Sequence, residues 1–408
     1  MAEQGKTVTF TAKPDAQFAV DAWSISGGTF KTGGTAGSST ATVDVTAAVT
    51  VKVKFKYTGD TLELESQAFT KGKTDTFTYT LVKAGSGSYT AEPENPAVIS
   101  VTINNDAGEA TVQCLDLGSS RIKVKDVLSG EDAYSGVITV PEGAFLTLSA
   151  DKKDIKVKAK TSDGFVTVEG CNETNLASGT ETTLHAKGTM VVLKGKIIEL
   201  DCGNSSSYNN SNKLTALNVQ GLSSLQRLSC NYNQLTVLDV QSLSALQWLS
   251  CSSNQLTELD VQGLSALQVL GCADNRFTAL NVQGLSALEG LVCDRNQLTS
   301  LNVQGLSTLK RLWCNDNRLT ALDVQGLSTL QELGCGGNEL TALNVQGLSA
   351  LQELDCGGNR LTALNVQGLS ALQKLSCYKN QLTALNVQGL SALQSLDCGS
   401  NQLTELNV

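Results

Sequence analysis

The second half of the chain carries hydrophobic residues at fixed places in a 21-residue period. One period reads Leu225-x-x-Leu228-x-Cys230-x-x-Asn233-x-Leu235-Thr236-x-Leu238-x-Val240-x-x-Leu243. Self-similarity at a fixed period of roughly 20–50 residues is the signature of a solenoid or another stacked-repeat architecture. We therefore predict that residues 197–408 form one array of stacked coils.

Each period predicts one short strand. We expect its leucines and its cysteine to point inward and to stack on their equivalents in the next coil, with parallel strands about 4.8 Å apart. Twenty-one residues leave no room for a full helix on the return side, so the return segments should be extended or tightly turned. Ten strand segments are expected, beginning at Ile197, Leu225, Leu246, Leu267, Leu288, Leu309, Leu330, Leu351, Leu372 and Leu393.

Cysteine and asparagine recur in register along the array. Parallel neighbours hold their Cβ atoms near the strand spacing of about 4.8 Å, above the ~3.8 Å that a disulfide prefers. The array contains no C-x-x-C pair and no nearby histidine, so the sequence does not indicate a metal site. We expect buried free thiols, and asparagines that hydrogen-bond the backbone of adjacent coils. The cysteines of this structural ladder are Cys230, Cys251, Cys272, Cys293, Cys314, Cys335, Cys356, Cys377 and Cys398.

The pattern L-x-x-L-x-C-x-x-N-x-L-T-x-L-x-V resembles the cysteine-ladder leucine-rich repeats of internalin-like bacterial surface proteins. The resemblance covers residues 197–408. It implies a mainly β fold, with a leucine-rich-repeat solenoid of ten coils, a parallel sheet on the concave face and little helix. It also implies a secreted or wall-attached protein with a role in adhesion.

The first half alternates between hydrophobic and polar residues over short stretches broken by glycine-rich turns, which predicts small β-sandwich-type domains. The runs T-V-T-F-T-A-K-P-D and V-T-V-K-V-K-F-K, with Trp23 between them, resemble a divergent B-type repeat of bacterial surface proteins. Residues 98–124 are similar to bacterial group 2 immunoglobulin-like domains. We predict a small β domain at 1–58, an immunoglobulin-like sandwich at 59–141, a β cap at 142–196 and the leucine-rich-repeat domain at 197–408.

Composition narrows the function. The net charge of −9 leaves no surplus of Lys and Arg to neutralise nucleic-acid phosphates. A single histidine, His185, and the lack of a nucleophile–base pair, phosphate loop or metal cluster argue against an enzyme, so we assign no catalytic residue, metal or cofactor. No apolar run approaches the ~20 residues of a membrane span. The first residues lack the apolar stretch of a secretory signal, so a secreted or cell-surface protein would have lost its leader.

The outward strand positions vary from coil to coil, whereas the core and the return turn are almost constant. Solenoids of this kind use their concave sheet as an extended binding surface. Trp, Tyr and Arg are the residues that most often dominate binding energy. A second zone, from Glu332 to Gly358, reads as a flat, acidic and glycine-rich strip. The candidate ligand-binding residues are Arg227, Tyr232, Trp248, Val269, Val292, Arg295, Arg311 and Trp313.

Two functions of different classes stay open. The first is a recognition or adhesion protein that binds a protein or glycoprotein of a host or neighbouring cell through the concave face. The second is a structural surface spacer with no dedicated ligand. Outward Trp248 and Trp313 favour the first, since a spacer gains nothing from exposing indoles.

The last coil begins at Leu393 and stops sixteen residues into its period. We expect its hydrophobic residues to be exposed, and its last strand to offer unpaired backbone groups. The chain should therefore be a monomer or a weak dimer that pairs end to end.

Overall fold

The computed structural model describes residues 7–12, 19–44, 50–56, 69–80, 89–106, 109–127, 132–135, 137–162, 164–203 and 211–408. These residues form strands and turns, and none of them is helical. The chain divides into two compact units, Met1–Pro141 and Glu142–Val408. The boundary predicted between residues 58 and 59 lies outside the described residues. A mainly β fold with little helix is confirmed.

The first unit consists of small sheets around two hydrophobic clusters. Trp23 packs edge-on against Phe30, with 6.2 Å between the ring centroids, in the first cluster. Ile99, Val112 and Ile122 are fully buried in the second. The sheets have the strand orders β1-β4-β3, β2-β5, β7-β10-β9, β11-β14-β6 and β13-β12-β8. The strands are β1 (Thr7–Thr11), β2 (Ala19–Ser26), β3 (Phe30–Gly33), β4 (Thr40–Asp44), β5 (Thr50–Lys56), β6 (Phe69–Thr70), β7 (Thr76–Thr80), β8 (Tyr89–Pro93), β9 (Ile99–Asn104), β10 (Glu109–Cys114), β11 (Gly118–Ser120), β12 (Ile122–Asp126), β13 (Asp132–Tyr134) and β14 (Ile138–Val140).

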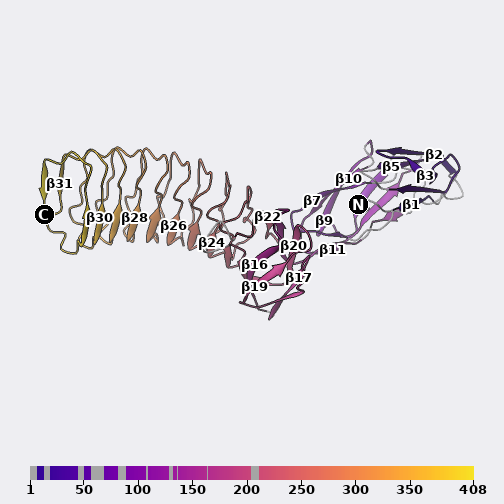
Figure 1. Cartoon of the computed structure of the whole chain (residues 1–408), viewed down its shortest axis with the longest axis horizontal. Helices are drawn as coiled ribbons and strands as arrows, with labels where there is room; N and C mark the ends of the chain where they lie inside the picture. The colour runs from indigo at the N-terminus through magenta and orange to yellow at the C-terminus, as the bar shows by residue number, and fades with distance from the viewer. Residues whose placement is uncertain are drawn as a thin grey trace. The chain divides into compact units, whose positions relative to one another are not determined.

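The second unit contains the solenoid, in which strands β23 to β30 form a row of short parallel arrows (Figure 1). A twelve-stranded sheet has the order β19-β16-β21-β23-β24-β25-β26-β27-β28-β29-β30-β32. Its ten parallel strands, from β21 to β32, are the ten that the period predicts. Their bounds are β21 (Ile197–Asp201), β23 (Arg227–Ser229), β24 (Trp248–Ser250), β25 (Val269–Gly271), β26 (Gly290–Val292), β27 (Arg311–Trp313), β28 (Glu332–Gly334), β29 (Glu353–Asp355), β30 (Lys374–Ser376) and β32 (Ser395–Asp397).

The strands of the repeats are shorter than the sequence predicts. We expected the second one to begin at Leu225, but it starts two residues later, at Arg227, and has three residues. The reason is that the Leu225 N–H donates to the Leu222 carbonyl in the preceding turn, at 3.0 Å, and so is not available to a neighbouring strand. Leu225, Leu228 and Cys230 are nevertheless fully buried, as expected.

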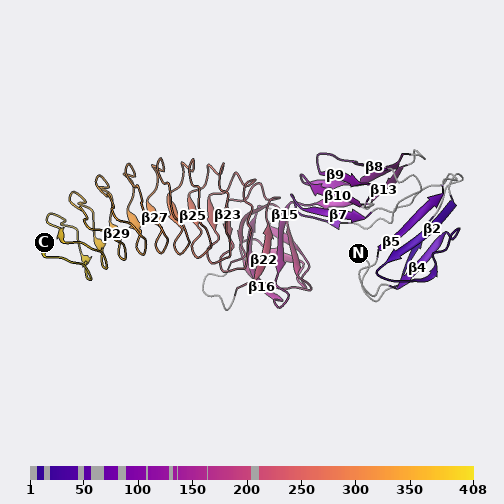
Figure 2. The same ribbon diagram turned by 90° about the horizontal axis from the view of Figure 1, so that it is seen from above.

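Residues 142–196 pair directly with the first coil. Strand β16 pairs antiparallel with β21, which places Lys158 opposite Asp201 and Lys160 opposite Glu199. Strand β15 pairs with β22, the return segment of that coil (Figure 2). A five-stranded sheet of order β18-β17-β20-β15-β22 results, and its core is continuous with that of the solenoid. The bounds are β15 (Gly143–Leu148), β16 (Asp154–Thr161), β17 (Phe165–Glu169), β18 (Asn175–Ala177), β19 (Glu181–His185), β20 (Met190–Lys194) and β22 (Leu214–Asn218).

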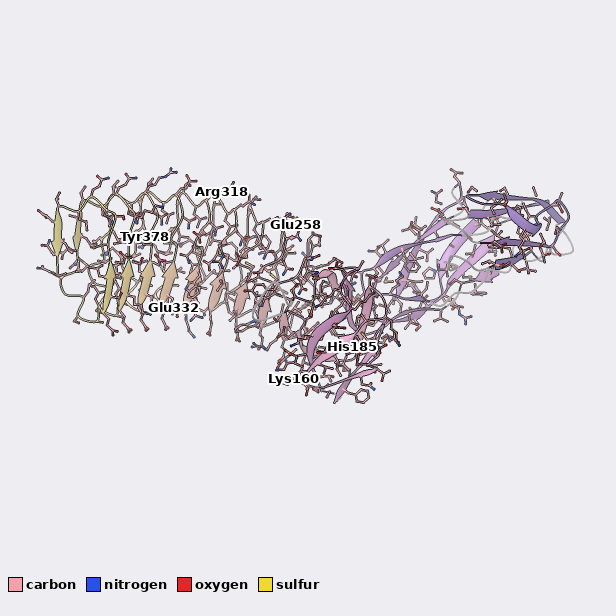
Figure 3. The ribbon with its side chains drawn as sticks, viewed as in Figure 1. Lys160, His185, Glu258, Arg318, Glu332 and Tyr378 are labelled. Carbon is pink, nitrogen blue, oxygen red and sulfur yellow. The ribbon has the colours of Figure 1, made fainter. Side chains whose placement is uncertain are left out.

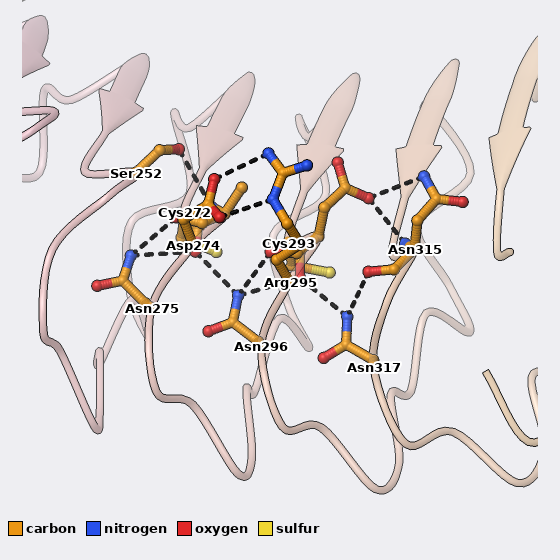
Figure 4. A network of polar contacts seen from close by, with 11 residues as sticks. Ser252, Cys272, Asp274, Asn275, Cys293, Arg295, Asn296, Asn315 and Asn317 are labelled. Carbon is orange, nitrogen blue, oxygen red and sulfur yellow. Dashed lines mark hydrogen bonds and ion pairs between the residues drawn. The ribbon is translucent and has the colours of Figure 1, made fainter. Parts of the chain in front are cut away.

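An asparagine ladder joins the coils (Figure 4). The Asn296 Nδ2 donates to the carbonyls of Cys272 and Cys293, both at 3.1 Å, and so ties one coil to the preceding one. Its Oδ1 accepts the Phe277 backbone N–H at 3.1 Å. The same arrangement recurs from Asn233 to Asn401. The ladder satisfies buried backbone groups that the short strands leave without partners.

A second ladder, formed by glutamine, runs along the return side. The Gln304 Nε2 donates to the carbonyls of Asp323 at 3.1 Å and Gln325 at 3.3 Å in the next coil. Apart from the buried Gln220, these side chains are exposed or half-buried, whereas the asparagines from Asn233 to Asn380 are buried. The glutamine that recurs in every coil therefore has a structural role.

All twelve cysteines are free, and all but Cys398 are buried. Leu396, Cys398 and Leu403 of the last coil are partly exposed, and Leu406 is 44% exposed. Strand β31 (Ala384–Asn386) pairs with β33 (Glu405–Asn407) on the return side of the last two coils.

Candidate recognition face

Side chains on either side of the buried central leucine of each strand point away from the core. Together with the outward residues of β16 and β21 they form one surface, which we call the sheet face. Figure 3 shows Lys160 and Glu332 along the side of this unit that carries the strands, and Glu258 and Arg318 along the opposite side.

Backbone register arranges the sheet face in two rows. Neighbours in a row lie one strand spacing apart, about 4.8 Å, close enough for their side chains to interact. The first row is Lys160, Glu199, Arg227, Trp248, Val269, Gly290, Arg311, Glu332, Glu353, Lys374 and Ser395. The second row is Lys158, Asp201, Ser229, Ser250, Gly271, Val292, Trp313, Gly334, Asp355, Ser376 and Asp397.

Six of the eight candidate binding residues lie in these rows. Trp248 is 37% exposed and Trp313 is 39% exposed, although both are large hydrophobic side chains. Val269 and Val292 are half-buried between them. Each indole has an arginine beside it: the Arg227 Cζ lies 4.4 Å from the Trp248 ring centroid, and the Arg311 Cζ lies 5.6 Å from that of Trp313. Cation–π contacts of this kind hold both side chains in defined positions.

The other two candidates, Tyr232 and Arg295, lie in the turn after each strand. Both have left-handed backbone conformations, with φ of 56° and 49°. The equivalent position in two later coils carries Gly337 and Gly358. Arg295 is held by Asp274 through two hydrogen bonds, of 2.6 and 2.9 Å, which raise the pKa of the guanidinium.

The carboxylates of the acidic strip form ion pairs with neighbouring cations. The Arg311 guanidinium forms a two-pronged ion pair with Glu332, at 2.6 and 2.7 Å, and its hydrogen bonds lower the pKa of that carboxyl. Lys374 forms an ion pair with Glu353. The Arg311–Glu332 ion pair thus links the aromatic and arginine-rich zone to the acidic strip. Arg311 and Lys374 are the cations at the two edges of the strip.

Glycines in the strip make room for neighbouring side chains. A Cβ on Gly334 would lie 2.7 Å from the Asn315 Nδ2, and one on Gly357 would overlap the Tyr378 ring. Tyr378 is 43% exposed, so this zone also presents an aromatic ring. The strip is therefore shaped by larger side chains from adjacent coils, and the sequence analysis did not single these out.

A buried carboxylate supports the turn beside the two rows. Asp294 is only 8% exposed, and burial raises its pKa. Its Oδ1 accepts the backbone N–H of Asn315 at 2.7 Å and the Asn315 side-chain amide at 2.9 Å, and these bonds partly oppose the shift. The Asn315 Oδ1 in turn accepts the Gly336 N–H at 2.8 Å. Asp294 therefore has a structural role.

Two open hollows mark the sheet face. The first, of about 180 Å³, is lined by the cations Lys158, Lys160 and Arg227, the carboxylates Glu199 and Asp201, and the Trp248 indole; we call it the basic hollow because its cations outnumber its carboxylates. The second, of about 400 Å³, is lined by residues that include Trp313, Glu332, Glu353, Asp355, Lys374 and Asp397; we call it the acidic hollow. Each contains one of the two exposed indoles.

Sequence reasoning missed the lysines of the basic hollow. The alternation I-K-V-K-A-K over residues 155–160 predicts a strand with a lysine face, and β16 has this exposure pattern. The alternation does not predict which strand pairs with β16. The antiparallel pairing of β16 with β21 brings these lysines beside Arg227.

Ten stacked parallel strands, with cysteine and asparagine ladders, define a leucine-rich-repeat solenoid. Among solved structures, the chain is similar to the functional domain of InlJ from Listeria monocytogenes, which includes a cysteine ladder, with 34% identity and a TM-score of 0.51. The match covers 55% of this chain and 49% of that one, so the chain spans about half the length of this relative. The similarity supports an internalin-like leucine-rich repeat.

Other solved structures share less with the chain. TLR13 in its complex with ssRNA13 is 25% identical with a TM-score of 0.38, covering 46% of this chain and 33% of that one. YopM from Yersinia enterocolitica WA-314 is 22% identical with a TM-score of 0.37, covering 46% and 49%. No protein-family model and no curated protein matches the chain.

Within the described part of the chain, no cluster of three or more potential metal ligands occurs. The same residues include no helix long and apolar enough to cross a membrane.

Proposed function

We propose that the chain is a recognition protein of the bacterial surface, secreted or attached, that binds a protein or glycoprotein partner through the sheet face. The observation that carries this proposal is the exposure of Trp248 and Trp313 on a rigid array, each with an arginine beside it. Aromatic and arginine side chains supply most of the binding energy in protein interfaces. The similarity to InlJ supports the surface location.

The spacing of the two indoles fits a macromolecular partner. Trp248 lies on β24 and Trp313 on β27, three strand spacings apart, which is roughly 14 Å at 4.8 Å per strand. The half-buried valines Val269 and Val292 fill the surface between them. A partner that covers both rings would exclude water from an apolar centre with charged residues at its edge, the usual anatomy of a protein interface.

Affinity capture with the immobilised full chain tests the proposal. A partner captured from host-cell or neighbouring-cell surface extracts should lose at least about 2 kcal/mol of affinity when Trp248→Ala and Trp313→Ala are combined, the scale of interface hot spots. Val237→Ala is the matched control, because Val237 is 64% exposed but lies outside the parallel sheet. Unchanged binding of the double variant would contradict the proposal, and failure to capture any saturable partner would favour a spacer.

A further inference from the structure

We infer that the sheet face binds a protein segment of defined chemistry, in which an apolar stretch covers the two exposed indoles and basic residues beyond it enter the acidic hollow. The inference rests on the proposed function, because it names the chemistry of the partner at the same face. The order of the outward side chains along the two rows carries it.

The apolar side chains of the sheet face form one diagonal stripe across four strands. The stripe passes from the first row on β24 and β25 to the second row on β26 and β27, through Trp248, Val269, Val292 and Trp313. On β25 and β26 the other outward residue is a glycine, so no side chain stands beside the stripe there. Three strand spacings across and two residues along a strand make the stripe about 16 Å long, the reach of about five extended residues.

Both ends of the apolar stripe are held in place by the chain itself. At one end the Arg227 guanidinium lies over the Trp248 indole, with Cζ 4.4 Å from the ring centroid. At the other end the Glu332 carboxylate accepts hydrogen bonds from Arg311, at 2.6 and 2.7 Å, and from the Trp313 side chain. Because these side chains are already ordered, a partner that packs against them loses less conformational entropy on binding.

The middle of the apolar stripe favours a protein segment over a saccharide. The half-buried side chains of Val269 and Val292 have no polar group that could bind a sugar hydroxyl. Apolar side chains of a protein gain affinity from covering them, because apolar surface leaves water.

The acidic hollow carries an excess of negative charge. The charged residues of its lining are Glu332, Glu353, Asp355, Asp397 and Lys374. Two of these carboxylates form the ion pairs with Arg311 and Lys374. The other two, Asp355 and Asp397, are exposed, form no ion pair within the described chain, and lie on either side of Ser376 in the second row. With four carboxylates against two cations, the hollow keeps two negative charges that a basic partner complements.

This charge lies where a segment that follows the apolar stripe continues. In the second row, Asp355 is two strand spacings beyond Trp313 and Asp397 is four, at about 10 and 19 Å. The hollow has a volume of about 400 Å³, and the Trp313 indole belongs to its lining. A lysine or arginine side chain can therefore lie against the indole while its N–H groups bind Asp355.

Fluorescence anisotropy with three labelled peptides and the full chain tests the inference. Each peptide has the apolar sequence Leu-Val-Gly-Leu-Val-Gly, followed by Lys-Lys-Lys, Gln-Gln-Gln or Glu-Glu-Glu. We expect saturable binding that is tightest for the lysine peptide and weakest for the glutamate peptide. Salt should diminish the difference, because exposed charges are screened.

Two variants separate the apolar contact from the charge. Trp313→Ala should weaken the lysine and the glutamine peptides alike, by about fivefold or more. Asp355→Asn with Asp397→Asn should weaken only the lysine peptide, by about fivefold, the scale of two exposed ion pairs. Both carboxylates accept the backbone N–H two residues later, from Gly357 at 3.0 Å and Gly399 at 3.1 Å, and asparagine can keep these bonds.

The matched control is Asp239→Asn with Asp323→Asn. These two exposed carboxylates also accept the backbone N–H two residues later, both at 3.1 Å, but they lie outside the parallel sheet. The control should leave the affinity for the lysine peptide within about twofold.

Four results would each overturn the inference: equal losses in the two double variants, no binding of the lysine peptide, no preference for it over the glutamine peptide, or full affinity in Trp313→Ala. The proposed function would still stand if partner capture remained sensitive to the combined Trp248 and Trp313 substitutions.

Discussion

Each buried ladder cysteine, from Cys230 to Cys377, is held as a neutral thiol by the array around it. Burial raises the pKa of Cys251 and of Cys377 to about 12, well above the pH of the cell or its surroundings. The thiolate is the reactive form, so these side chains should resist alkylation and oxidation in the folded chain. Cys398 differs because it is partly exposed.

Thiol titration with and without denaturant measures this protection. Under native conditions we expect about one reactive group per chain, assigned to Cys398, and all twelve after unfolding without reductant. Cys398→Ser should remove the native reaction. Recovery of fewer than twelve thiols after unfolding would show that disulfides exist and would contradict the ladder of free thiols.

The single histidine offers a second residue-scale test. His185 Nδ1 lies 2.6 Å from Glu173 Oε1, and this hydrogen bond raises the pKa of the histidine. The Glu173 carboxylate also accepts the His185 backbone N–H at 2.8 Å, which, with the ring contact, lowers the pKa of Glu173 to about 2. Because the folded-state pKa of His185 is raised, the stabilisation is complete below the unfolded value of 6.5 and is lost as pH rises through the folded value.

An NMR titration of the imidazole should give a pKa above 6.5, without ambiguity because the chain has one histidine. Glu173→Gln should return the pKa toward 6.5. Asp154→Asn is the control and should lower it less, because Asp154 acts on His185 only through its charge. A pKa that Glu173→Gln leaves unchanged would refute the ion pair.

At the scale of the element, loss of a side chain from each of the two amide ladders should lower the free energy of unfolding by different amounts. Asn296 donates to buried carbonyls and accepts a buried N–H, so Asn296→Ala leaves several buried groups without partners. At about 1–3 kcal/mol for each unsatisfied group, the free energy of unfolding should fall by at least ~2 kcal/mol. Gln304→Ala removes bonds at an exposed site, where water replaces them, and should cost less than about 1 kcal/mol.

Urea unfolding of both variants under the same conditions checks the difference. The comparison is matched because each residue bridges two neighbouring coils with its side-chain amide. Equal losses in the free energy of unfolding would contradict the prediction that the buried asparagine ladder stabilises the array more than the glutamine ladder does.

The repeat elements could be predicted because their period alone fixes them. A central leucine every 21 residues places Trp248 and Trp313 on the outward side in any register that buries the leucines. Strand length could not be predicted in the same way, since the turn at Leu222–Leu225 takes the N–H that a longer strand would need.

The rest of the face depends on contacts between distant segments. The alternation in β16 gives a lysine face, but its place beside Arg227 comes from pairing with β21, about 40 residues later in the chain. The shape of the acidic strip likewise depends on Tyr378, which occupies the space over Gly357 in the previous coil. Neither contact leaves a periodic signal, because each occurs once.

At the scale of the whole molecule, the solenoid unit presents one continuous surface of changing charge. The sheet face begins with three cations and two carboxylates around the basic hollow and ends with four carboxylates and Lys374 around the acidic hollow. A partner with charges arranged in the opposite order would bind in one orientation only, since the reversed orientation places like charges together. The exposed indoles lie at both ends of the apolar centre between these zones.

The most direct test of recognition through the sheet face is acrylamide quenching of tryptophan fluorescence with and without the captured partner. The chain has three tryptophans, and Trp23 is buried in the other compact unit, so Trp23→Phe leaves Trp248 and Trp313 as the only reporters. We predict that quenching falls clearly when the complex forms, because the partner covers both rings. Unchanged quenching in a complex that is shown to have formed would contradict recognition through this face.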